Sequence, residues 1–311
     1  MTAEPVASEE LDLLRAGWER VSQPLDRRDR MTELVVGGAF LIAATAIALF
    51  LDADRDFDPA TAAALVALFA LSTRVQLTVG QGYTVPSQLA FVPMLLLLPT
   101  PIVPLLVLAG WLLGKLPETL AGRSHASRLL YTLANSWFAI GPALVLTLLD
   151  AQTPEWSDWP VYLLALLSQF VVDTIAGEVR EWIGRGVAPH LTLGLIGWVQ
   201  AIDLLLSPLG LLAAFASEDE KWAFLLLFPP ATLLILYARE REGRLSSALA
   251  LAEAAQRREE LIAGASHEML TPLAVLRGLT GRLASKRPID DERRAEIHQA
   301  MAREVARLRQ L

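Results

Sequence analysis

The chain has 311 residues, of which 53% are hydrophobic and 20% are charged, and its formal net charge is −7. This acidic balance argues against general nucleic-acid binding, because no basic face can be assembled from the apolar part of the chain. The absence of cysteine excludes disulfides, iron–sulfur clusters and thiolate zinc sites.

Charged residues are distributed unevenly along the sequence. Residues 31–238 contain 8 Lys or Arg and 16 Asp or Glu, whereas the much shorter stretch 239–311 contains 14 and 11. A single soluble domain does not show this contrast, so we expect an apolar domain over 31–238 followed by a polar one. Residues 1–30 are charged and lack the apolar core of a signal peptide, and we expect them to form a cytoplasmic N-terminal segment.

The apolar part is predicted to form about eight transmembrane helices. A bilayer core needs roughly 20 apolar residues of helix, and the apolar runs lack the alternation of a strand barrel. The expected spans are residues 31–51, 59–79, 85–99, 101–116, 129–149, 159–177, 191–216 and 221–238. Four prolines disturb regular helix within 85–116, where we predict a tight helical hairpin; the alternative is one long span with a re-entrant piece.

Basic residues between the spans predict the orientation. Basic segments favour the cytoplasmic side. With the N-terminus inside, the inner segments hold eleven Lys or Arg and the outer loops only Arg55 and Lys221. Eight spans then place both termini in the cytoplasm. We therefore expect a multi-pass protein of the inner (plasma) membrane.

Two acidic residues inside the predicted spans are candidates for intramembrane sensing, because ionisable groups are costly in a bilayer. They are Asp173 and Asp203, and three polar side chains lie in the same part of the sequence: Asn135, Gln169 and Gln200. One interpretation is a ligand, ion or proton site between the sixth and seventh spans. The alternative is structural, with Asp173 reaching water at the inner interface and pairing with Arg180.

The remaining features of the apolar part predict structure rather than chemistry. Gly110 and Gly114 form a GxxxG pair, which allows two helices to approach closely. His125 and His190 have no partner ligands nearby in sequence, so no metal site is expected. The chain carries none of the motifs GxxxxGK[ST], HExxH, GxSxG or GxGxxG.

Residues 239–260 predict a helical linker, because they are rich in Ala, Leu, Glu and Arg and contain no Pro. In the next stretch, His267 and Thr271 share one helix face, and Glu268 lies beside the imidazole. Pro272 removes a backbone donor and is expected to bend the helix one turn below the histidine. A histidine at a bend, with a carboxylate beside it and a hydroxyl one turn on, indicates a nucleophile site.

The stretch SHEMLTPL, 266–273, resembles the phosphoacceptor box of sensor histidine kinases. The loop SKRPID and a second helix follow, and that helix carries apolar residues three and four positions apart at 297, 301, 305, 308 and 311. Two such hairpins make a four-helix bundle. We therefore predict an all-α fold, with a polytopic transmembrane domain, the linker 239–260 and a dimerisation and phosphoacceptor domain over 261–311.

The resemblance implies a membrane sensor histidine kinase of a two-component system. His267 would be the phosphorylated nucleophile, and the phosphoryl group would pass to an aspartate of a response regulator. Glu268 would act as the base, Thr271 would position water for the phosphatase reaction, and Pro272 would set the bend. The sequence departs from the family pattern at Leu270, where a basic residue is usual. His298 lies on the second helix, where we expect a solvated side chain without a catalytic role.

Only 44 residues follow His267, too few for the ATP-binding domain of that family. We therefore expect a fragment of a kinase with no cofactor of its own, and ATP and Mg²⁺ as requirements of the full-length enzyme. The expected partners are a second copy of the chain, a response regulator and the lipid bilayer, without nucleic acid. Two alternatives stay open: a non-catalytic membrane phosphotransfer protein, and a transporter-like membrane protein.

Overall fold

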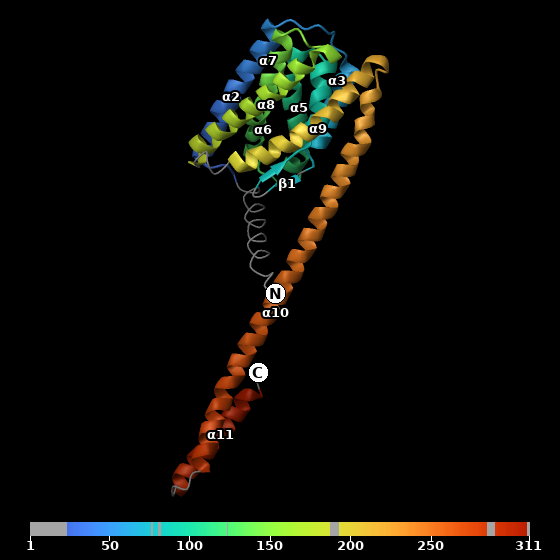
Figure 1. The fold of residues 1–311 in the computed structure, drawn as a ribbon. Helices are drawn as coiled ribbons and strands as arrows, with labels where there is room; N and C mark the ends of the chain where they lie inside the picture. The colour runs from blue at the N-terminus through green and yellow to red at the C-terminus, as the bar shows by residue number, and fades with distance from the viewer. Residues whose placement is uncertain are drawn as a thin grey trace. The chain divides into compact units, whose positions relative to one another are not determined.

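The structure, a computed structural model, describes residues 24–75, 77–79, 82–122, 124–186, 193–284 and 290–309. Most of the predicted N-terminal segment and residues 285–289 of the predicted hairpin loop lie outside these ranges. The chain divides into two compact units, Met1–Arg241 and Glu242–Leu311, which we call the apolar unit and the hairpin unit. Figure 1 shows the helices and strands of both units.

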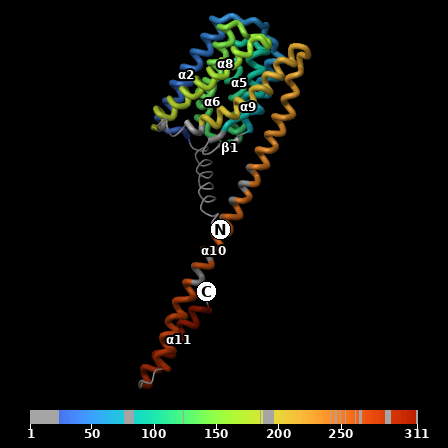
Figure 2. Tube along the Cα trace, in the orientation of Figure 1, coloured from blue at the N-terminus to red at the C-terminus, as the bar shows by residue number. Residues whose placement is uncertain are grey.

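The apolar unit is built almost entirely from helices, whose path Figure 2 shows as a tube. Its α-helices are α2 (Arg27–Phe50), α3 (Pro59–Ser72), α4 (Gln88–Leu97), α5 (Val103–Leu120), α6 (Leu130–Asn135), α7 (Ile140–Leu148), α8 (Trp159–Arg180), α9 (Leu193–Asp219) and the first part of α10 (Phe228–Leu283). Short 3₁₀ segments extend several of them, including η1 (Thr100–Ile102), η2 (Ala126–Leu129), η3 (Ser136–Ala139), η4 (Trp156–Asp158) and η7 (Ala223–Leu227). One π-helical turn, η5 (Glu181–Arg185), follows α8.

The all-α prediction is confirmed for the described residues apart from one short hairpin. Strand β1 (Leu77–Val79) pairs antiparallel with β2 (Gly82–Thr84). The second predicted span ran to residue 79, but α3 ends at Ser72. The Ser72 hydroxyl donates to the carbonyl of Leu68 at 3.0 Å, and Thr73 does the same to Ala70 at 2.8 Å. Such back-bonds compete with helix continuation and favour its end.

Six helical segments of the described residues are long and apolar enough to cross a bilayer, against about eight predicted. They are Arg27–Phe50, Thr100–Leu120, Ala126–Leu148, Trp156–Gly184, Ile196–Asp219 and Ala223–Arg241. The other two apolar helices, α3 and α4, have 14 and 10 residues. At about 1.5 Å per residue they extend roughly 21 and 15 Å, which is less than the bilayer core of about 30 Å.

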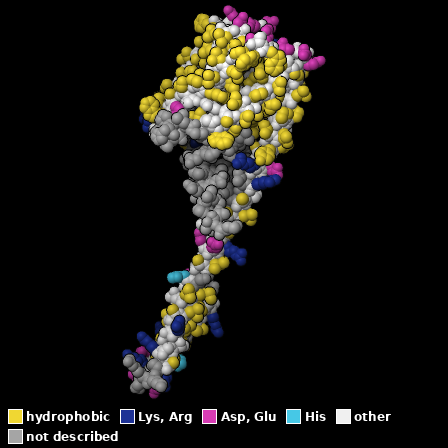
Figure 3. Space-filling model, in the orientation of Figure 1, with side chains coloured by type: hydrophobic (Ala, Val, Ile, Leu, Met, Phe, Trp, Pro, Cys, Tyr) yellow, Lys and Arg dark blue, Asp and Glu magenta, His cyan; other side chains and the backbone are white. Residues whose placement is uncertain are grey.

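Helix α4 ends at Leu97, because Leu98 precedes Pro99 and is extended, and protein surrounds most of this helix. All residues from Thr84 to Phe91 are buried, and Phe91 and Met94 are completely so. Non-helical backbone at membrane depth is stable only where protein buries it, as here between β2 and α4. The outer helices are much more exposed, since only 11% of the most apolar stretch of Trp156–Gly184 is buried, and this exposed apolar surface fits a membrane-bound form. Figure 3 shows hydrophobic side chains over the visible flank of this unit.

The predicted GxxxG pair packs α5 against α3. A Cβ added at Gly110 would lie 2.6 Å from the ring of Phe69, and one at Gly114 would lie 2.9 Å from the carbonyl oxygen of Ala70. Side chains do not tolerate such contacts, so only glycine permits this approach. The prediction that these glycines allow two helices to come close is confirmed.

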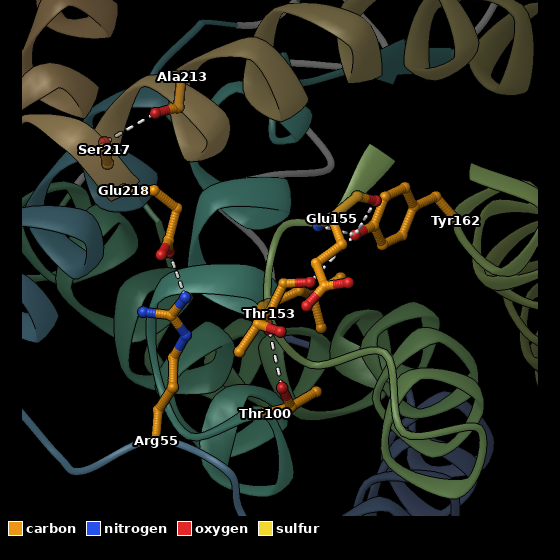
Figure 4. A network of polar contacts seen from close by, with 9 residues as sticks. Arg55, Thr100, Thr153, Glu155, Tyr162, Ala213, Ser217 and Glu218 are labelled. Carbon is orange, nitrogen blue, oxygen red and sulfur yellow. Dashed lines mark hydrogen bonds and ion pairs between the residues drawn. The ribbon is translucent and has the colours of Figure 1, made fainter. Parts of the chain in front are cut away.

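Acidic residues gather at one end of the apolar unit, which we call the acidic end (Figure 3). They lie in the α2–α3 and α7–α8 connections, in the last turn of α9 and just after it: Asp52, Asp54, Asp56, Asp58, Asp150, Glu155, Asp158, Glu218, Asp219 and Glu220. Two ion pairs tie the α2–α3 connection to the end of α9 and the residues just after it, namely Arg55 with Glu218 and Lys221 with Asp58. Figure 4 shows the pair of Arg55 and Glu218. It also shows Tyr162, whose hydroxyl donates to the carbonyl oxygen of Thr153 and accepts from the backbone N–H of Glu155.

The opposite end, which we call the basic end, is held by arginines that cross between helices. The Arg180 guanidinium on α8 donates to Glu33 of α2 at 2.9 Å and to Asn135 of α6 at 2.6 Å. Arg28 of α2 donates to the carbonyl of Ile183 at 2.7 Å. Because the Glu33 side chain is buried, the pairing with Arg180 fixes how α2 and α8 lie against each other.

The hairpin unit contains the rest of α10 and α11 (Asp291–Leu308). Asp290 caps α11, because its carboxylate accepts from the backbone N–H of Arg293 at 2.7 Å. Helix α11 returns beside the last turns of α10 (Figure 1). The apolar side chains between them are half-buried: Leu276, Leu279, Leu283, Ile297, Met301 and Leu308. No described residue of α11 is fully buried, so this hairpin lacks a closed core.

Candidate functional site

The predicted phosphoacceptor residues lie on α10 within the hairpin unit. His267, Glu268 and Thr271 all have exposed side chains. Thr271 donates its hydroxyl hydrogen to the carbonyl oxygen of His267 at 3.2 Å, which places the two residues on consecutive turns of one face. Since the hydroxyl oxygen can still accept hydrogen bonds, it remains able to orient water.

Pro272 follows directly in the same helix. It has no backbone N–H, so the carbonyl of Glu268 loses its usual partner one turn on. Helix α10 is nevertheless continuous from Phe228 to Leu283, and the bend expected at Pro272 stays a prediction. The local result is a weakened turn next to an exposed imidazole.

Large apolar side chains surround the phosphoacceptor residues and face outward. Between 42% and 63% of each of these side chains is exposed: Met269, Leu270, Leu273, Val275 and, on α11, Val305. Exposed apolar surface of this kind marks a contact with another protein surface. The hairpin therefore exposes both an imidazole and several apolar side chains.

The second candidate region is a set of polar side chains inside the apolar unit. Asp203 of α9 is buried, and Gln169 of α8 donates to its carboxylate at 3.3 Å. One turn away, Gln200 donates to the hydroxyl of Thr174 at 2.8 Å. These two bridges link α8 to α9, as polar side chains commonly do between membrane helices.

Other members of the predicted polar set lie apart from this cluster. Asn135 bonds Arg180 at the basic end, and Asp173 is half-buried on α8. Among the described contacts Arg180 pairs with Glu33, and no ion pair joins it to Asp173. The proposal that Asp173 and Asp203 sense a signal stays a prediction.

Gln88, which the sequence analysis did not single out, belongs to this cluster. Its side chain lies near the Asp203 carboxyl and is completely buried. Within the described residues, neither of its amide atoms makes a hydrogen bond of normal geometry, and the same is true of Asp203 Oδ1. The sequence does show Gln88 as a lone glutamine in the apolar stretch 84–98. Because it lies outside the sixth and seventh predicted spans, the sequence did not indicate that it is close to Asp203.

The fold and the site together define the class: an apolar multi-helix unit joined to a helical hairpin that exposes a histidine. Residues 257–311 match the His Kinase A (phospho-acceptor) domain. This match confirms the resemblance inferred from SHEMLTPL and supports a histidine kinase, and the apolar helices fit a membrane-bound form. It covers less than a fifth of the chain. No curated protein and no solved structure matches the chain.

Proposed function

We propose that the protein is the membrane-sensing and phosphoacceptor portion of a two-component histidine kinase. The observation that carries this proposal is the exposed His267 within the matched phospho-acceptor domain, on a helix that begins in the apolar unit. The coarser conclusion, membership of residues 257–311 in the phospho-acceptor family, does not depend on the steps that follow.

In the proposed reaction, one ring nitrogen of His267 attacks the γ-phosphorus of ATP. The bond from that phosphorus to the bridging oxygen breaks, and ADP leaves. Glu268 accepts a hydrogen bond from the other ring nitrogen and stabilises the positive charge that develops on the ring. The phosphoryl group then passes to an aspartate of a response regulator, with cleavage of the phosphorus–nitrogen bond. Thr271 orients water for the opposing hydrolysis.

Phosphorylation of His267 requires ATP and Mg²⁺. The sequence of the chain has no glycine-rich phosphate loop. Among the described residues, no group of three His, Asp or Glu side chains could hold a metal ion. We propose that a kinase catalytic domain presents the nucleotide to His267.

The apolar face of the hairpin supports a dimer. Leu270, Leu273 and Val275 are 42–63% exposed, although burial of such side chains is favourable by about 25 cal/mol per Å². A second hairpin would cover them and complete a four-helix bundle. We propose a homodimer through this face, with the response regulator as a transient partner.

For the membrane part we propose that the basic end faces the cytoplasm and the acidic end lies outside, with both termini in the cytoplasm of the inner membrane. Basic segments resist translocation. Because the chain has no cysteine, single cysteines test the orientation directly. In intact cells, an impermeant thiol reagent should label Ser157→Cys at the acidic end and spare Thr280→Cys on α10. Labelling of Thr280→Cys alone would reverse the assignment.

The phosphoacceptor is tested by supplying the membrane-embedded chain with a histidine-kinase catalytic domain and labelled ATP. The label should be acid-labile and base-stable, as expected of phosphate on nitrogen. His267→Gln should abolish the label, because residues 261–283 contain no other histidine. His298→Gln, an exposed histidine on α11, is the matched control and should label normally. Full labelling of His267→Gln would disprove the proposal.

A further inference from the structure

A cavity of about 170 Å³ lies inside the apolar unit, between α4, α7, α8 and α9. Its walls are mainly apolar and include Leu96, Leu146 and Ala165. An apolar cavity of roughly 150 Å³ in another protein admits benzene, so this one has room for a small ring-sized molecule. Apolar walls also make water a poor occupant.

The cavity reaches the lipid-facing surface. Leu163 of α8 and Leu204 of α9 both line it, and they are 54% and 50% exposed. Helix α8 packs mainly on α7, and α9 mainly on α4, so the opening lies between these two helix pairs. A molecule dissolved in the bilayer therefore reaches the cavity without crossing water.

Four polar residues line the cavity: Gln88, Tyr162, Gln169 and Ser207. The last three each make a hydrogen bond to another residue, so the Gln88 amide is the polar group that a ligand would meet. Gln88 is completely buried, and its amide oxygen has no hydrogen-bond partner within the described residues, while its amide nitrogen lies near the Asp203 carboxyl without a hydrogen bond of good geometry. The backbone of Gln88 packs closely against α9, because a Cβ added at Gly210 would lie 2.6 Å from the backbone carbonyl oxygen of Gln88. A buried amide left in this state is costly, and a ligand that pairs with it recovers that cost.

We propose that this cavity binds a compact, uncharged amphiphile from the bilayer, with an apolar body and one head group that both donates and accepts hydrogen bonds at Gln88. An anion is disfavoured, because no Lys, Arg or His is among the described residues that line the cavity, and the Asp203 carboxyl lies close to Gln88. A cation gains little, because the Asp203 carboxylate is not part of the lining.

The position of the cavity connects binding to the rest of the chain. Helix α9 forms one wall and leads through η7 into α10, which carries His267. An effect of the ligand on phosphorylation rests on the proposed function of His267, whereas binding of the ligand to the cavity does not. Binding and His267 labelling are therefore measured separately, so the failure of either one is recognised.

The probe is 4-fluorobenzyl alcohol, and 4-fluorotoluene is its matched partner without the hydroxyl. Binding of each to the full chain in lipid nanodiscs is followed by ¹⁹F NMR, with empty nanodiscs to subtract partitioning. We expect saturable binding of the alcohol at one site per chain. In Gln88→Met, which keeps the side-chain volume, the preference for alcohol over toluene should fall about tenfold, because the hydrogen bonds to the head group are lost.

Two further variants keep the test decisive if Gln88→Met fails to fold. Ala165→Leu fills the cavity and should abolish saturable binding of both probes. Leu167→Met, on the exposed face of α8 outside the lining, should bind like the parent. Circular dichroism verifies the fold of each variant. Absence of saturable alcohol binding in the parent, unchanged binding in folded Ala165→Leu, or stronger binding of 4-fluorobenzylamine than of the alcohol would each overturn the proposal.

Discussion

The two units of this chain are stabilised in opposite ways. In the apolar unit, side-chain hydrogen bonds join distant residues: Arg180 to Glu33 across 147 positions, and Trp137 to the carbonyl of Val36 across 101. In the hairpin unit, bonds such as Thr271 to His267 join residues only four apart. The first unit fixes its own fold through long-range contacts. The second leaves His267 and several large apolar side chains exposed.

This contrast predicts where substitutions act. In the hairpin unit, changes near His267 should alter chemistry and leave stability almost unaffected, because the side chains are exposed. In the apolar unit, substitutions at tightly packed positions should alter stability, because long-range packing holds the helices. Each prediction below tests one side of this difference.

The largest effect is expected at Glu268. Glu268→Gln keeps the size of the side chain but removes the base beside His267, so the rate of phosphorylation should fall roughly 10²–10⁴-fold. The rate is measured with a supplied catalytic domain under single-turnover conditions. Glu292→Gln, an exposed carboxylate on α11, is the control and should leave the rate unchanged. An unchanged rate in Glu268→Gln would remove Glu268 from the reaction.

A smaller effect, on stability alone, is expected at Gly114. Gly114→Ala places a methyl group against the backbone of Ala70 and should destabilise the apolar unit by about 1–3 kcal/mol, as overpacking does. Gly38→Ala on α2 is the matched control, because nothing lies within 4 Å of its added Cβ. Thermal unfolding in detergent measures both variants. Equal stability of the two would show that α3 and α5 separate without cost.

Much of this arrangement was readable from sequence, and the failures have specific physical causes. Hydropathy located the apolar helices, because each needs a run of apolar residues, and SHEMLTPL identified the phospho-acceptor domain. Hydropathy does not distinguish a helix that lipid surrounds from one that protein surrounds, so α3 and α4 were predicted as complete spans. Helix α4 is more apolar than the candidate spans α2 and α8, although other helices of the protein bury most of its residues.

Polar partners inside the apolar unit were the other weak point. The sequence placed Gln169, Gln200 and Asp203 in one region, and the structure joins α8 to α9 through them. It did not connect Gln88, 115 positions before Asp203, because such a contact depends on how α4 packs against α9. Arg180 offers several hydrogen-bond donors, and nothing in the sequence shows that it pairs with Glu33 rather than Asp173.

The smallest expected effect is at the acidic end, where Asp58 caps α3. Its carboxylate accepts from the hydroxyl of Thr61 at 2.5 Å and pairs with Lys221 at 2.9 Å. These contacts lower the pKa of Asp58 from 3.8 to about 2, chiefly through the Thr61 hydrogen bond and then through Lys221. Because the pKa is lower in the folded state, the stabilisation is present above about pH 4 and is lost as the pH falls towards 2.

Asp58→Asn isolates this contribution from the other carboxylates that titrate in the same range. The parent should unfold at a slightly higher temperature than Asp58→Asn at pH 6, and the difference should shrink between pH 4 and pH 2. The effect is small because the carboxylate is exposed to solvent, and salt should weaken it further. A difference that stays constant across this pH range would show that Asp58 acts only as a neutral cap, which Asn also provides. The ion pair with Lys221 would then add nothing to the stability of the acidic end.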